Sequence, residues 1–332
     1  MINNNISFKP FSKIELLDLT TKRVGETKIG ELIHLSDNLE QCKFAIIGIN
    51  EDIGPQANGG LPGSISAFKS FIQRFLNVQS NEFLNGKEIC VLGEVFVNEP
   101  FTTLEKARIT VEEIDDFVFK LVQPIVEKGI IPIVIGGGHN NAYPLIKSCY
   151  TSLNNAIDVV NLDPHADCRP LEGRHSGNSF SYAKEHHFLN HYSVIGLHES
   201  YNSAYIYNYL RKHNFIYTLF EDHLLDPLLT QKSIAKILEN KEEKRFIGIE
   251  LDLDAIAMMP SSAFTPSGFS IENARIYIQL LAQNQNICYL HLPEGAPSNQ
   301  IEEKIVGKTL VYLVLDFIKT TIKSKQKHEE KG

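Results

Sequence analysis

Short, nearly continuous runs of aliphatic and β-branched residues recur along this chain and limit the folds open to it. Strands without polar alternation are typical of sheets that are buried on both faces, and such sheets are mainly parallel. The runs predict strands at 43–49, 89–93, 131–135, 157–163, 192–198, 215–219, 245–253 and 287–292.

Helical patterns separate these runs. Between 106 and 128, apolar residues recur near the 3.6-residue period of a helix, at positions such as Val111, Ile114 and Phe117. The predicted helices are 64–77, 106–128, 141–150, 231–240, 271–284 and 300–323. Alternating strands and helices predict an α/β fold with a doubly wound, mainly parallel sheet. We expect a single domain over 1–332, with a frayed tail from about 321.

Composition excludes several classes of partner. The net charge of −8 and the pI near 5.9 argue against nucleic acid and acidic membranes. The sequence has no apolar run long enough to span a bilayer, and its polar start lacks a signal-peptide core. Five cysteines without paired spacing fit a reducing compartment. We therefore expect a cytoplasmic protein that acts on a small molecule.

Acidic residues and histidines follow two of the predicted strands. Asp163, His165 and Asp167 alternate after the apolar run at 157–162, and a strand's period of two would place them on one face. Asp252 and Asp254 again stand two apart at the end of an apolar run. Burying carboxylates side by side costs several kcal/mol unless a cation or a proton compensates, so the pattern suggests a metal cluster.

A histidine after a third strand extends this cluster. His139 follows Gly136, Gly137 and Gly138, which allow a sharp turn and close approach of the backbone. Ligand sites of open α/β sheets gather at the carboxyl ends of strands, where all three segments end. The candidate ligands offer oxygen or imidazole nitrogen, because alternation points Cys168 away. Such a set suits Mn²⁺ better than Zn²⁺.

The motifs GGGH at 136–139, DPHAD at 163–167 and DLD at 252–254, in this order, resemble the ureohydrolase family of arginases, agmatinases and formimidoylglutamases. The resemblance implies an arginase-like three-layer α/β/α sandwich, two Mn²⁺ per chain and a possible homo-oligomer. The family usually has Asp where Gly138 stands and Ala where Pro164 stands, but neither position supplies a ligand.

The resemblance also implies two ligand groups that share Asp163 and Asp252. The first ligand group is His139, Asp163, Asp167 and Asp252, and the second ligand group is His165, Asp163, Asp252 and Asp254. Asp167 and Glu294 are the expected catalytic residues. Glu294 begins an E-x-x-P segment similar to one in the family, which implies that its carboxylate holds the cationic amidine of the substrate.

The segment after DPHAD bears on the substrate. Phe180 stands where arginases carry a histidine that is a proposed proton shuttle, and the S-G-x-x-F pattern from Ser176 resembles formimidoylglutamases. Their reaction converts N-formimidoyl-L-glutamate and water to L-glutamate and formamide. Two substrate carboxylates require positive charge, so the expected substrate-binding residues, besides Glu294, are Arg169, Arg174, His175 and Asn178. Leu61 stands where the family often has Arg.

Other functions stay open at this point. The chain could be an arginase-type or agmatinase-type enzyme that releases urea, or a catalytically silent metal-binding member of the family. A hydrolase of the related deacetylase fold, with one Zn²⁺, commonly has tandem histidines before the glycines of its metal loop. Here His186 and His187 lie downstream on a polar stretch, which favours a surface position.

Overall fold

The computed structural model describes residues 5–98, 103–239 and 245–329. Its centre is a nine-stranded sheet in the order β1-β3-β2-β4-β9-β8-β5-β6-β7. Every pairing is parallel except that of β1 with β3. The strands are β1 Ile6–Pro10, β2 Phe44–Asn50, β3 Ile89–Val97, β4 Ile131–Ile135, β5 Ile157–Leu162, β6 Leu189–Leu197, β7 Ile216–Leu219, β8 Ile247–Leu251 and β9 Ile287–Leu292.

Successive residues of the inner strands enter two separate hydrophobic cores. Ile46 and Ile133 pack into the core on one face of the sheet, while their neighbours Ile47 and Val134 pack into the other. A strand alternates its side chains between faces, so a run that is apolar at every position serves both cores. This explains why the strand runs show almost no polar alternation.

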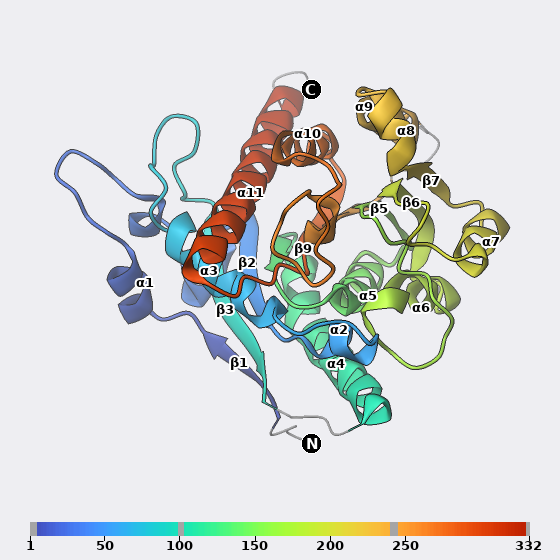
Figure 1. Cartoon of the computed structure of the whole chain (residues 1–332). Helices are drawn as coiled ribbons and strands as arrows, with labels where there is room; N and C mark the ends of the chain where they lie inside the picture. The colour runs from blue at the N-terminus through green and yellow to red at the C-terminus, as the bar shows by residue number, and fades with distance from the viewer. Residues whose placement is uncertain (1–4, 99–102, 240–244, 330–332) are drawn as a thin grey trace.

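Helices cover both faces of the sheet and complete three layers (Figure 1). The helices with residues in one core are α3 Ala67–Phe75, α8 Phe220–Leu225, α9 Leu229–Leu238, α10 Ile271–Leu281 and α11 Gln300–Glu329. Those with residues in the other are α2 Ile53–Ala57, α4 Leu104–Glu127, α5 Ala142–Leu153, α6 Ser179–Glu185 and α7 Ala204–Lys212. Helix α1 Lys13–Leu19 lies outside, near the edge strands. The predicted α/β/α sandwich is confirmed.

All eight predicted strands are present, with ends that differ by a few residues. The sequence did not reveal β1, an edge strand in which only Ile6 is buried. The pattern of so short and exposed a strand is too weak to detect.

The expected frayed tail from about 321 is wrong for the described residues. Helix α11 continues to Glu329, and Thr321 is buried. The lysine-rich composition suggested a solvated tail, but a helix anchored by Val314 and Phe317 continues past these buried residues. No described helix is both long and apolar enough to cross a membrane.

The strand order determines where the functional side chains meet. Strands β4, β9, β8 and β5 are consecutive neighbours in the sheet, although other strands separate β5 from β8 in the sequence. Their carboxyl ends lead directly to His139, Glu294, Asp252 and Asp163. Four distant segments therefore contribute to one site.

Candidate metal centre and pocket

The glycine turn after β4 buries His139 completely. Gly136 and Gly137 have φ of 84° and 73°, a region that favours glycine. The carboxylate of Glu51, just after β2, holds this turn: its Oε1 accepts from Gly138 N at 2.9 Å and from Asn141 Nδ2 at 2.7 Å. A buried carboxylate thus fixes the loop that carries the first histidine.

The three residues after β5 lie in a loop, which corrects the expected arrangement along a strand. Strand β5 ends at Leu162, before Asp163. The loop turns because His165 N donates to Asp163 Oδ1 at 2.7 Å and because Asp167 is left-handed, with φ of 46°. Loop geometry, rather than a strand's period of two, directs these side chains toward one place.

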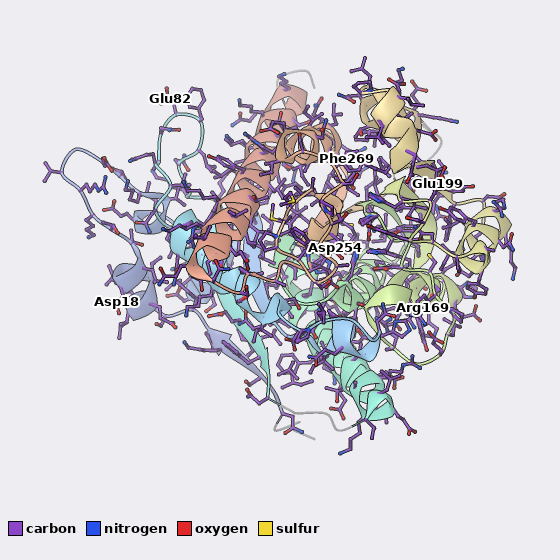
Figure 2. All side chains as sticks on the ribbon, in the orientation of Figure 1. Asp18, Glu82, Arg169, Glu199, Asp254 and Phe269 are labelled. Atoms are coloured by element: carbon purple, nitrogen blue, oxygen red, sulfur yellow. The ribbon has the colours of Figure 1, made fainter. Side chains whose placement is uncertain are left out.

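The acidic pair after β8 is fixed by backbone donors. Asp254 N donates to Asp252 Oδ1 at 2.7 Å, and Ala263 N donates to Asp254 Oδ1 at 3.0 Å. Each carboxylate keeps a second oxygen for the site. Figure 2 shows Asp254 toward the middle of the molecule, whereas Asp18, Glu82 and Glu199 lie near its periphery.

The first ligand group forms a compact cluster. His139 Nδ1 lies 3.0 Å from Asp252 Oδ2, 3.0 Å from Asp167 Oδ2 and 3.2 Å from Asp163 Oδ2. One ligand atom from each of the four residues lies within 4.8 Å of all the others. This is the arrangement expected of side chains that surround one cation.

The second ligand group is more open. His165 Nδ1 lies 3.5 Å from Asp163 Oδ1 and 3.9 Å from Asp254 Oδ2. The His165 ring stacks on Tyr201, with ring centroids 5.4 Å apart. Tyr201 in turn stacks on His198 at 4.8 Å, so an aromatic column holds His165 at the pocket wall.

The pKa values of these residues report the crowding of charge. Burial and the neighbouring carboxylates Asp254 and Asp163 raise the pKa of Asp252 well above its usual value. Burial acts to lower the pKa of His165, but Asp163 and Asp254 outweigh it and raise the pKa to about 10. His139 behaves in the same way: burial opposes ionisation, yet the surrounding carboxylates raise its pKa well above the usual value. The site attracts positive charge strongly.

The donor set fits divalent manganese. The two groups supply carboxylate oxygens and two imidazoles, and Cys168 next to them is buried in the hydrophobic core instead. A carboxylate-rich set with a minority of imidazole suits Mn²⁺. The same excess of negative charge that raises the pKa of both histidines would be compensated by bound cations.

Glu294 closes the site from the end of β9. Its Oε1 accepts from His139 N at 2.6 Å, its own N donates to Gly137 O at 2.9 Å, and its φ is 67°. Its Oε2 is buried and accepts no hydrogen bond among the described residues. Burial, together with Asp254, raises the pKa of the carboxyl to about 8, while the nearby Ser262 side chain acts to lower it. An unpartnered buried carboxylate oxygen beside the cluster is available to a cationic ligand.

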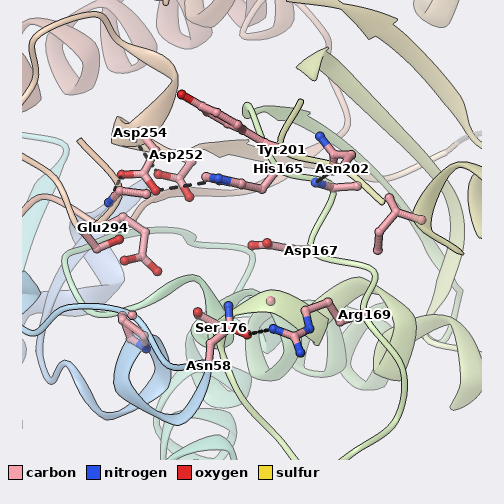
Figure 3. Close-up of a pocket in the computed structure, with 17 residues that line it drawn as sticks. Asn58, His165, Asp167, Arg169, Ser176, Tyr201, Asn202, Asp252, Asp254 and Glu294 are labelled. Atoms are coloured by element: carbon pink, nitrogen blue, oxygen red, sulfur yellow. Dashed lines mark hydrogen bonds and ion pairs between the residues drawn. The ribbon is translucent and has the colours of Figure 1, made fainter. Parts of the chain in front are cut away.

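A pocket of about 280 Å³ opens above the cluster. Figure 3 shows Asp252, Asp254 and Glu294 on one side of it and Arg169 with Asn58 on the other. Arg169 Nη1 donates to Asn58 Oδ1 at 2.6 Å, and Arg169 Nη2 forms an ion pair with Glu172 at 2.8 Å. Tyr201, Asn202 and Ser176 also line the pocket. Its size fits a small molecule, with acidic groups at one end and a guanidinium at the other.

Three of the predicted substrate-binding residues are structural instead. Arg174 is buried and donates to Asp115 Oδ2 at 2.8 Å, to Asn178 Oδ1 at 2.6 Å and to Asn140 O at 2.9 Å. His175 is fully buried, and burial together with Arg169 and Arg108 lowers its pKa to about 4, so it is neutral near pH 7. These side chains and Asn178 support the loop after β5 on its buried side. None of the three lines the pocket. Sequence position alone could not distinguish them from Arg169.

Comparisons with known proteins agree with this architecture. Residues 42–318 match the model of the arginase family, and the chain belongs to that family. Formimidoylglutamase of Streptococcus pyogenes is 24% identical over 318 residues, which cover 90% of this chain and 92% of that protein. The predicted family, with formimidoylglutamases among its relatives, is confirmed.

Solved structures show the same fold. Formimidoylglutamase from Bacillus subtilis aligns with a TM-score of 0.76 at 19% identity, over 91% of this chain and 94% of that one. Formiminoglutamase from Trypanosoma cruzi, solved with Mn²⁺, aligns with a TM-score of 0.69 at 21% identity, over 88% and 98%. At these identities the likeness shows the fold.

Several residues that shape the site were not predicted from the sequence. Glu250 and His291 carried a detectable signal, because each is a titratable residue inside an otherwise apolar strand run. Glu51, Asn58 and Tyr201 carried none, since each lies outside the motifs and reaches the site only through the fold. His186 and His187 are exposed, in accordance with their predicted surface position.

We expect Mn²⁺ binding to release protons and to strengthen as the pH rises. With His165 at a pKa of about 10 and His139 well above its usual value, both imidazoles carry an extra proton in the metal-free protein near pH 7. A ligating imidazole must be neutral and a ligating carboxyl ionised. At least two protons per chain should therefore leave, one from each imidazole, and a protonated Asp252 would add to them. Calorimetric titration in buffers of different ionisation enthalpy measures this release. A His213→Asn variant should release as many protons, and a buffer-independent heat would contradict the prediction.

Arg169 and Arg174 should differ in their effect on stability. Arg174→Met leaves Asp115 buried without its partner, which should lower the free energy of unfolding by about 3–5 kcal/mol. The side chain of Arg169 is 45% exposed, so Arg169→Met should cost no more than about 1 kcal/mol. Urea unfolding of the metal-free proteins makes the comparison. Equal losses of unfolding free energy in the two variants would show that the Arg174–Asp115 pair stabilises the fold no more than the exposed Arg169 does.

Proposed function

We propose that this protein is a binuclear manganese hydrolase that cleaves N-formimidoyl-L-glutamate to L-glutamate and formamide. The observation that carries the proposal is the polarity of the pocket: the unpartnered Oε2 of Glu294 lies beside the metal-capable cluster at one end, and Arg169 lies at the other. A substrate with a cationic amidine at one end and carboxylates at the other matches this distribution of charge.

In this proposal the residues of the site have distinct roles. The first and second ligand groups would each hold one Mn²⁺, with Asp163 and Asp252 shared. Two close divalent cations lower the pKa of water and supply hydroxide near neutral pH. Glu294 binds and orients the amidine through its free oxygen, and the positive charge of the amidine lowers the carboxyl's pKa from about 8 so that it ionises. Asp167 belongs to the first ligand group and also lines the pocket, next to the reacting end of the substrate.

Arg169 recognises the carboxylate end of the substrate. It is the one arginine or lysine among the described residues that line the pocket, and Asn58 fixes its guanidinium. A substrate carboxylate would compete with Glu172 for this guanidinium, while the second carboxylate would face polar groups such as Ser176 and Asn202. Agmatine has no carboxylate and gains nothing from this end of the pocket.

An arginase-type reaction is the second candidate. One observation favours it: a single guanidinium in the pocket lining suits a substrate with one carboxylate, such as arginine. A second observation argues against it. Phe180, at the position of the arginase histidine, is fully buried and stacks on Tyr192 at 4.2 Å, so this position supplies no proton carrier.

Product analysis on the Mn²⁺-loaded protein tests the proposal. Formamide release from N-formimidoyl-glutamate should exceed urea release from arginine and from agmatine. Arg169→Ala should raise KM for N-formimidoyl-glutamate and lower kcat/KM by about one to two powers of ten, because a charge-assisted pair is lost while the metals stay bound. Faster urea release by the unchanged protein would overturn the substrate assignment.

Glu294→Gln should separate substrate binding from metal binding. Because Glu294 belongs to neither ligand group, the variant should retain the Mn²⁺ content of the unchanged protein. Loss of its charge should lower kcat/KM by a factor on the order of 10². Metal analysis and steady-state kinetics check the two parts, with Glu82→Gln, an exposed carboxylate near the periphery of the molecule, as the control. Near-normal kcat/KM in Glu294→Gln would refute its role at the amidine.

A further inference from the structure

A second cluster of titratable side chains lies directly behind His139, within the sheet. Glu250 of β8 and His291 of β9 are fully buried and are paired in the register of the two strands. Tyr289, also of β9 and fully buried, completes the cluster. None of the three belongs to either ligand group, and none lines the pocket among the described residues.

Three side chains converge on the carboxylate of Glu250. Tyr289 donates its hydroxyl to Oε1 at 2.8 Å, and His291 Nδ1 lies 2.7 Å from Oε2. His139 Nε2 lies 3.3 Å from the same Oε2. The last contact is too long for a well-formed hydrogen bond, and Nε2 has no hydrogen-bond partner among the described residues. An ionised carboxylate only accepts, so both rings direct an N–H toward it.

The contact determines which nitrogen of His139 is left for a cation. With a proton on Nε2, the neutral ring has its lone pair on Nδ1. Nδ1 is the atom that lies 3.0–3.2 Å from the three carboxylates of the first ligand group. The ring therefore faces Glu250 with Nε2 and the carboxylates of the first ligand group with Nδ1. In this tautomer the lone pair on Nδ1 is available to a metal ion.

We propose that Glu250 is a positioning residue, held by Tyr289 and His291, that fixes the tautomer and orientation of His139 for metal binding. Carboxylates behind ligating imidazoles raise the basicity of the ligand and tune metal affinity. This inference rests on the metal site of the proposed function and is independent of the identity of the substrate.

Mn²⁺ affinity, measured by calorimetry and by chelator competition, tests the role of Glu250. Glu250→Gln keeps the volume but removes the charge, and it should weaken binding at one of two Mn²⁺ sites on the order of 10- to 100-fold. The other site should change much less. Raising the Mn²⁺ concentration should restore most of kcat, because Glu250 acts on the occupancy of the site and does not touch the substrate.

A matched control separates positioning from general stability. Asp316 in α11 is also a buried carboxylate, paired with Arg275 at 2.6 Å on a different part of the fold. Asp316→Asn should lower the free energy of unfolding but leave both Mn²⁺ affinities unchanged. If Glu250→Gln and Asp316→Asn weaken Mn²⁺ binding alike, Glu250 has only a structural role and the proposal fails.

A Tyr289→Phe variant tests the same role of Glu250 if Glu250→Gln does not fold. It removes one donor to Glu250 and leaves His139 untouched, and it should weaken the same Mn²⁺ site by several-fold. Unchanged affinity in this variant, or in folded Glu250→Gln, would overturn the proposal. The proposal would also fail if the unchanged protein bound a third Mn²⁺ and the variant lost it. That result would mean that His139, Glu250 and His291 themselves bind an ion.

The outcomes also distinguish this inference from the proposed function. Two Mn²⁺ bound by the unchanged protein, without hydrolysis of N-formimidoyl-glutamate, would refute the substrate and leave the role of Glu250 standing. Two Mn²⁺ bound with normal hydrolysis, and with no effect of Glu250→Gln, would refute the role of Glu250 alone. An unchanged protein that binds no Mn²⁺ would refute both.

Discussion

The mutual repulsion of buried carboxylates is the constraint on which the site depends. Asp163, Asp167 and Asp252 bring oxygens to within 3.2 Å of a single imidazole nitrogen, in an interior that solvates charge poorly. Only positive charge can compensate, so without metal the two histidines hold protons tightly. Bound cations would replace these protons and neutralise the carboxylates. Because the loops hold the carboxylates together, the affinity for metal would be a consequence of how the loops fold.

Rigid loops maintain this unfavourable arrangement. Asp167 and Glu294 adopt positive φ in the loops that follow β5 and β9, and such conformations of non-glycine residues persist only where surrounding contacts impose them, whereas glycine adopts positive φ readily at Gly136. Two further buried carboxylates supply some of these contacts: Glu51 holds the glycine turn, and Glu250 faces the far side of His139. Acidic residues around this centre therefore form the candidate ligand cluster in one layer and support it in the next.

Two arginines close together in the sequence illustrate how burial decides between binding and structure. Arg169 reaches the pocket with much of its side chain exposed, so its guanidinium can meet a substrate carboxylate. Arg174 is enclosed by Asp115, Asn178 and a backbone carbonyl, and its donors are already used. The pocket consequently carries less positive charge than the sequence suggested, and under the proposed function Arg169 would recognise the carboxylate end of the substrate.

The sequence by itself determined an α/β fold with a doubly wound, mainly parallel sheet, because continuous apolar runs require a sheet buried on both faces. It also indicated the acidic clusters, because paired carboxylates require compensation. The three-layer sandwich and the two ligand groups followed from the resemblance to the ureohydrolases. The same resemblance indicated Glu294 through a motif. The tertiary structure alone decided that β4, β9, β8 and β5 lie side by side, which brings Glu294 to His139. It also decided that Arg174 and His175 are buried and that Glu250 contacts His139. These outcomes depend on strand order and loop conformation, which arise from contacts between residues far apart in the chain and leave no local pattern in the sequence.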